Sequence, residues 1–185
     1  VHRFDPADRG APIHAAARGG HKQLVCDLLL IAGVSPNTRD GFCSTPLHIA
    51  AELAHDKVVC TLLVRAADKD ALDRDRCSSL MLASMQGHCA TVKTLLAAGA
   101  DVGIHSNFLM FAALPRAVSA FDLAAREGHV CVLQAMVEHG MDAKAANVHG
   151  HTALHHAAAE NKVGAIHVLL DAGADVDANA MTGVS

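Results

Sequence analysis

The sequence predicts an all-α solenoid of stacked helix–turn–helix units, and two repeating patterns predict it. A seven-residue phrase begins at residues 11, 45, 78, 119 and 152, and apolar stripes with helical spacing follow its copies. The steps between the copies are 34, 33, 41 and 33 residues. A near-constant step of this size is typical of repeat proteins, in which each unit buries its apolar face only against its neighbours.

The first helix of each unit is predicted from the phrase, which is clearest as TPLHIAA at residues 45–51. Thr45 can cap a helix by accepting a hydrogen bond from a free backbone N–H. Pro46 fits the first helical turn, where its missing N–H costs nothing. The other copies read APIHAAA, SSLMLAS, SAFDLAA and TALHHAA. The third and fourth lack Pro and His but keep a capping serine and the alanine, so we count them as units.

The second helix of each unit is predicted from apolar residues at positions i, i+1, i+4 and i+5. In the second unit these are Val58, Val59, Leu62 and Leu63. The same slots hold Leu24, Val25, Leu28 and Leu29 in the first unit and Val132, Leu133, Met136 and Val137 in the fourth.

The second helices should end at Gly99, Gly140 and Gly173, because glycine readily takes the left-handed conformation that closes many helices. Gly33 comes one place later in the first unit, which explains its step of 34 residues. The second unit has Ala66 in this slot. A left-handed conformation costs a non-glycine residue about 1–2 kcal/mol, so we expect a loose or differently shaped helix end there.

A T-P-L-H-x-A phrase with a period near 33 residues resembles the ankyrin repeat. The resemblance covers residues 1–185 as a single array, with units at about 6–39, 40–72, 73–103, 114–146 and 147–179 and the start of a sixth at 180–185. It implies an ankyrin-type helix–turn–helix solenoid with short loop or β-turn fingers. We expect the array to continue, since the fifth unit otherwise needs a polar capping repeat.

An insertion interrupts the period within residues 104–118, where the step is eight residues longer than 33. This is the most apolar loop of the chain and includes Phe108 and Phe111. One interpretation is that its apolar residues fold back onto the solenoid and fill a gap. The other is an exposed apolar finger that anchors a partner, because insertions in repeat arrays often lie on the binding face.

Charge and hydropathy exclude several classes of function. The net charge is −4, and the isoelectric point near 6.4 argues against nucleic acid or an anionic membrane as the main partner, since both need clustered Lys and Arg. No apolar run approaches the roughly 18 residues of a membrane span, and the first residues do not form a signal peptide. We expect a monomeric intracellular protein, cytoplasmic or nuclear, without direct membrane insertion.

The chain has six cysteines, and we interpret all six as reduced thiols. Cys26 and Cys60 occupy equivalent slots of neighbouring units, and no C-x-x-C is present. Stacked helices lie roughly 8–10 Å apart, whereas a disulfide needs Cα atoms within about 7 Å. Reduced thiols are typical of intracellular proteins.

Fourteen histidines raise the question of a metal site. His14, His48 and His155 occupy the His slot of the phrase, for which the resemblance implies structural hydrogen bonds. His21, His55, His88 and His129 lie ten residues after their phrase starts, at the turn between helices. His151 and His155 have a metal-ligand spacing, but His151 precedes the predicted cap Thr152 and so lies outside the helix. We therefore predict no metal, no cofactor and no catalytic residue; the sequence has no G-x-S-x-G, H-E-x-x-H or phosphate loop.

In the ankyrin family, ligands usually meet the loop tips and the outer face of the first helices, which line one concave groove. Transferred slot by slot, this pattern predicts a partner-binding surface. Its residues are Phe42, Leu53, Arg74, Asp75, Met85, Gln86, Phe108, Phe111, Arg116, Arg126, Glu127, His149 and His151.

Three functions fit these patterns. The first is a non-enzymatic protein–protein interaction scaffold that presents this groove to a protein partner. The second is the regulatory or substrate-recruiting array of a larger enzyme or channel. The third is a metal- or ligand-binding protein that uses the His-rich fifth unit.

Overall fold

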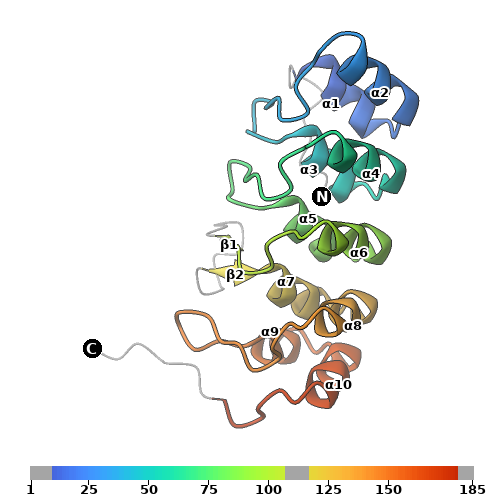
Figure 1. The fold of residues 1–185 in the computed structure, drawn as a ribbon. Coiled ribbons are helices and arrows are strands. Elements are labelled where there is room, and N and C mark those ends of the chain that lie inside the picture. The colour runs from blue at the N-terminus through green and yellow to red at the C-terminus, as the bar shows by residue number, and fades with distance from the viewer. Residues whose placement is uncertain (1–9, 107–116, 179–185) are drawn as a thin grey trace.

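The computed structural model describes residues 10–106 and 117–178, which form a stack of helix pairs with loops projecting to one side (Figure 1). Each pair consists of a short first helix and a longer second helix, as predicted. The helices are α1 (Pro12–Arg18), α2 (Lys22–Leu30), α3 (Pro46–Glu52), α4 (Asp56–Val64), α5 (Ser79–Gln86), α6 (Cys89–Ala97), α7 (Ala120–Glu127), α8 (Val130–Glu138), α9 (Ala153–Ala159) and α10 (Val163–Asp171).

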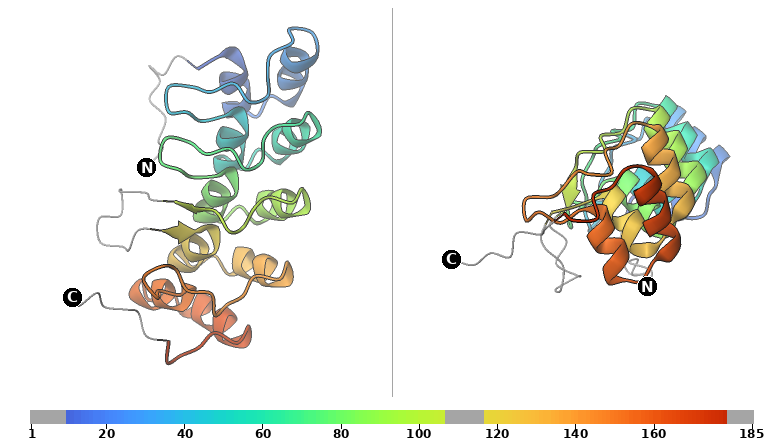
Figure 2. Two further views of the ribbon diagram at one scale, coloured as in Figure 1. Left: turned by 60° about the vertical axis from the view of Figure 1, so that its left-hand side comes forward. Right: turned by 90° about the horizontal axis from the view of Figure 1, so that it is seen from below.

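The helices form two rows, which are visible when the stack is viewed along its length (Figure 2). The first helices α1, α3, α5, α7 and α9 contact one another in order, and the second helices α2 to α10 do the same. The described part of the chain is therefore the all-α solenoid that the sequence predicts. Within it, no helix has the length and apolar character needed to cross a membrane.

The core runs between the two rows. Leu47, Ala50 and Ala51 of α3 and Val58, Val59 and Leu62 of α4 have no exposed surface. Ala50 and Ala51 have small side chains, which leave room for close packing of α3 against its neighbours α1 and α5. Leu24 differs from the equivalent Val58, because 47% of its surface is exposed. In the described residues no helix pair precedes the first unit, so that flank of α2 lacks a partner.

Side chains cap the first helices of the second to fifth units, whereas α1 begins after Ala11 without a side-chain cap. The Thr45 hydroxyl lies 2.8 Å from His48 Nδ1, and the Thr45 N–H donates to the same nitrogen. Thr152 and His155 repeat this arrangement in the fifth unit. In the fourth unit, Asp122 takes the place of the histidine and accepts from the Ser119 N–H at 2.9 Å. The sequence showed that the fourth copy lacks His, but no capping role was predicted for Asp122, although S-x-x-D places an acceptor where a capping box needs one.

The second helices end as predicted at left-handed residues. Gly99, Gly140 and Gly173 have φ values of +76°, +96° and +85°. Ala66 adopts the same conformation with φ 59°. The helix end of the second unit therefore keeps the shape of its neighbours, and the expectation of a different shape is wrong.

The insertion begins and ends in a two-stranded antiparallel sheet. Strand β1 (His105–Ser106) pairs with β2 (Val118–Ser119), so that His105 lies opposite Ser119. This brings the described residues on either side of the insertion together. Phe108, Phe111 and Arg116 lie outside the described residues, so whether the insertion packs on the solenoid stays a prediction.

A disulfide joins Cys89 of α6 to Cys131 of α8, with Cα atoms 6.0 Å apart. The prediction of six reduced thiols is therefore wrong at these two positions, and Cys26, Cys43, Cys60 and Cys77 are free. The distance of roughly 8–10 Å between stacked helices applies to cysteines in equivalent slots of neighbouring units, such as Cys26 and Cys60. Cys89 and Cys131 lie eleven and twelve residues after their phrase starts, and this stagger brings them within disulfide range.

Candidate functional site

The loops between units form a row of fingers, and an acidic or amide side chain shapes the tip of each of three. Asp40 Oδ1 accepts from the N–H groups of Phe42 and Ser44 at 2.9 and 2.8 Å. Asp73 accepts likewise from Asp75 and Cys77. The amide oxygen of Asn147 accepts from His149 and His151. These residues lie five positions before their phrases, and in the fourth unit that position is Leu114.

Hydrogen bonds also join neighbouring fingers. The Arg74 N–H donates to the Phe42 carbonyl at 2.9 Å, and the Arg74 guanidinium donates to the carbonyl of Gly41. Arg39 donates to the Leu72 carbonyl at 2.7 Å. The Ser106 hydroxyl donates to the Asp75 carbonyl at 2.8 Å. These hydrogen bonds fix the backbones of the first three fingers relative to one another.

Phe42 and Arg74 form the most distinct feature of the tips. The Arg74 guanidinium lies over the Phe42 ring, 5.3 Å from its centre, a favourable cation–π geometry. Arg74 is exposed and Phe42 is partly exposed. Aromatic and arginine side chains are enriched at protein interfaces. The structure brings these two predicted residues together, from adjacent fingers.

The turn histidines link each unit to the one before it. His55 Nε2 lies 2.9 Å from the carbonyl oxygen of Arg18. His88 and His129 make the equivalent contacts with Glu52 and Met85, at 2.9 and 3.0 Å. The sequence showed the periodic slot but gave it no role. These bonds cross every junction among the first four units, where the first helices end.

Other predicted residues lie along the ends of the first helices. Leu53 and Met85 are half-buried, and Gln86 is exposed. Met85 lines a small apolar pocket with Met81, Val118 and Leu123 at the base of the inserted finger. Arg126 forms an ion pair with Glu160 at 3.4 Å, and Glu127 beside it is half-buried. These residues thus lie near the ends of the first helices, while Phe42 and Arg74 lie at the finger tips.

A histidine cluster lies in the fifth unit. The ring of His151 is 5.3 Å from that of His155 and 6.1 Å from that of His156, centre to centre. Burial, with smaller contributions from neighbouring histidines, lowers the pKa values of His151 and His156. Predicted residue His149 is exposed at the tip of the same finger. The described residues contain no group of three or more His, Cys, Asp or Glu side chains arranged to hold a metal ion.

His48 is the most buried of the phrase histidines. It has no exposed surface, and its Nε2 lies 3.1 Å from the Cys77 carbonyl of the next unit. Burial lowers its pKa, although Asp73 and the carbonyl acceptors oppose this shift. The unfolded chain therefore binds a proton more readily than the folded one below the usual histidine pKa of about 6.5.

We expect stability to fall as the pH drops below about 6.5, by up to about 1.4 kcal/mol per pH unit for each such histidine. The shifts of His151 and His156 act in the same direction. Urea midpoints measured between neutral and mildly acidic pH test this. His48→Gln should show a shallower pH dependence than the parent chain. An unchanged pH dependence in that variant would contradict the assignment to His48.

Comparison with known protein families gives one match. A family model described as ankyrin repeats, in three copies, matches residues 13–106 and again residues 80–180. No match was found among curated proteins.

Proposed function

Because this chain belongs to the ankyrin repeat family, whose repeats are generally protein–protein interaction modules, we propose that it is a non-enzymatic scaffold that binds one protein partner in its groove. The groove consists of the finger tips and the ends of the first helices described above. Phe42, Arg74, Met85 and the Arg126–Glu160 pair lie along it. An intracellular location is part of the proposal.

The main support for this proposal is the stacking of two side chains at the finger tips. Arg74 and Phe42 are stacked at the tips of adjacent fingers, and backbone hydrogen bonds hold both fingers in place. Packing of the solenoid does not require an exposed arginine on an aromatic ring at a loop tip. Side chains ordered before binding lose less conformational entropy when a partner docks. The arrangement therefore suits a protein interface.

The test begins with identification of the partner by affinity capture and mass spectrometry, and the dissociation constant is then measured by titration calorimetry. Phe42→Ala, Met85→Ala and Arg116→Ala should each weaken binding about tenfold or more, as expected for central interface residues. Far-UV circular dichroism should be unchanged. Lys93→Ala, on the exposed side of α6, is the control and should bind normally. Parent-like affinity in all three variants would rule out the groove.

A further inference from the structure

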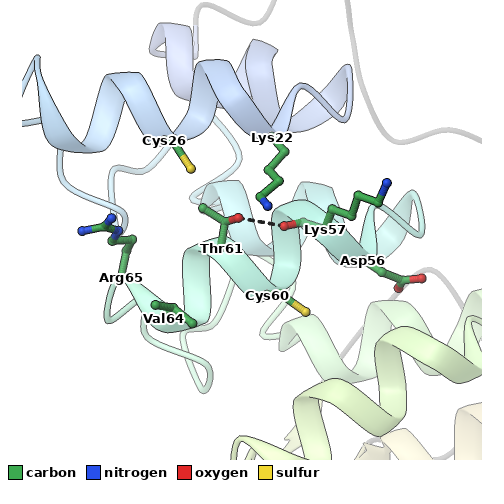
Figure 3. A pocket seen from close by; sticks show the side chains of 8 residues that line it. All are labelled: Lys22, Cys26, Asp56, Lys57, Cys60, Thr61, Val64 and Arg65. Carbon is green, nitrogen blue, oxygen red and sulfur yellow. Dashed lines mark hydrogen bonds between the residues drawn. The ribbon is translucent and has the colours of Figure 1, made fainter.

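A second surface lies on the row of second helices, between α2 and α4, on the opposite side of the stack from the fingers (Figure 1). It is an open groove of about 410 Å³. Figure 3 shows its lining: Lys22 and Cys26 extend from α2 toward α4, and Thr61 and Arg65 lie on the side of α4 that faces α2. Cys60 and Val64 of α4 complete the lining from its outer side. The groove lies on a side of the solenoid, so the stacking of units does not cover it.

Cys26, Cys60 and Val64 form an apolar strip in the lining of this groove. Cys26 and Cys60 line it, and neither is part of the disulfide. Val64 is 82% exposed, and Leu30, in the equivalent slot of the first unit, is 57% exposed. Ile31 beside Leu30 is 83% exposed. Clustered exposed apolar side chains on a soluble domain are typical of interaction sites.

The charges around the groove have one predominant sign. Lys22 and Lys57 lie near the start of the two helices, and Arg65 lies at the end of α4. None of the three forms an ion pair with another described residue. The lining includes Asp56, but its carboxylate accepts a hydrogen bond from Thr91 of the following unit. The groove therefore offers positive charge at both ends of an apolar strip.

The equivalent surface between α8 and α10 provides a comparison within the same chain. That groove measures about 280 Å³ and is lined by Gln134, Val137, Glu138, Val168, Asp171 and Ala172. The slot nineteen residues after each phrase start holds Leu30, Val64, Ala97, Glu138 and Asp171 in turn. Apolar character and positive charge are thus features of the first two units, and the solenoid fold itself does not require them.

We propose that the α2–α4 groove binds a short acidic amphipathic helix of a protein partner, which lies alongside α2 and α4 as a third helix. Lys57 and Arg65 are eight residues apart, which is about 12 Å along a helix. A partner helix with acidic residues about two turns apart matches this separation. Apolar residues on the same face, one turn from each acid, then lie over Cys26, Cys60 and Val64. The inference concerns a different surface from the finger groove and stands independently of it.

The probe is a synthetic helical peptide of about 18 residues, long enough to populate a helix in water, with glutamates seven positions apart flanking two leucines. The control is a peptide of the same sequence in which lysine replaces each glutamate. Nuclear magnetic resonance shifts of the full chain should change in α2 and α4 with the acidic peptide and stay unchanged with the basic one. The affinity should fall as salt is raised.

Charge reversal tests the site itself. Lys57→Glu with Arg65→Glu should weaken binding of the acidic peptide at least tenfold. Arg76→Glu with Lys144→Glu, which reverses two exposed charges on the fingers, should leave it unchanged; melting temperatures confirm that both variants fold. Three outcomes would overturn the proposal: no shifts in α2 and α4, equal binding by the reversed variant, or self-association of the parent chain that the reversal abolishes, which would assign the groove to a second copy.

Discussion

Replacing Leu62 by alanine should lower the free energy of unfolding by about 2–5 kcal/mol. Leu62 has no exposed surface and belongs to the core between α3 and α4. Its unit packs on neighbours at both flanks, through α1 and α5 in one row and α2 and α6 in the other. Removing three carbon atoms of its side chain leaves a cavity that the surrounding helices can fill only in part. Domains have only about 5–15 kcal/mol of total stability, so the loss is large.

The same slot in the first unit provides a matched control. Leu28 is equivalent to Leu62 in the repeat but is only partly buried. Leu28→Ala should therefore cost clearly less than Leu62→Ala in urea unfolding followed by far-UV circular dichroism. Equal costs at the two positions would contradict the account, because in a stack the central units should depend on two interfaces and an end unit on one.

Loss of the Cys89–Cys131 disulfide should have the second largest effect. The bridge closes a loop across 42 positions that contains the whole insertion and α7. Restricting a loop of this length in the unfolded chain stabilises the folded state by about 2–4 kcal/mol. We expect Cys89→Ser with Cys131→Ser to lower the free energy of unfolding by that amount, and a thiol reductant to lower that of the parent to the same value.

Cys26→Ser with Cys60→Ser is the control, since both thiols are free, and reductant should still destabilise it. Thiol titration of the denatured parent under non-reducing conditions should detect the four free cysteines and not all six. Six titrating thiols would show that the bridge does not form. All six cysteines would then be reduced, as the sequence predicted.

Sequence periodicity predicted the helices because each unit contains residues that mark where its helices begin and end. Thr45 and Pro46 begin α3, and the apolar stripe through Val58 and Leu62 defines the buried side of α4. Ala66 shows the limit of local reasoning. A left-handed alanine is unfavourable by itself, but the neighbouring helix ends have the same shape, and the stack imposes it.

Contacts between units were harder to predict. The sequence placed His55, His88 and His129 in one slot, yet their bonds to the carbonyls of the preceding unit depend on the distance between stacked helices. The disulfide was missed for the same reason, since a stagger of one residue between α6 and α8 decides it. Among the site residues, Phe42 and Arg74 were predicted one by one. Their stacking depends on the distance between adjacent fingers, which is set by the packing of two units and cannot be predicted from the residues of one.

The central claim is that single units are too small to fold alone and become stable only by stacking. Circular dichroism of an isolated peptide covering the second unit, residues 40–72, tests it most directly, with the full chain measured under the same conditions. We expect the full chain to show a cooperative helical melt and the peptide to show almost no helix, because short helices are marginal in water. A peptide that is helical and melts cooperatively would contradict the account.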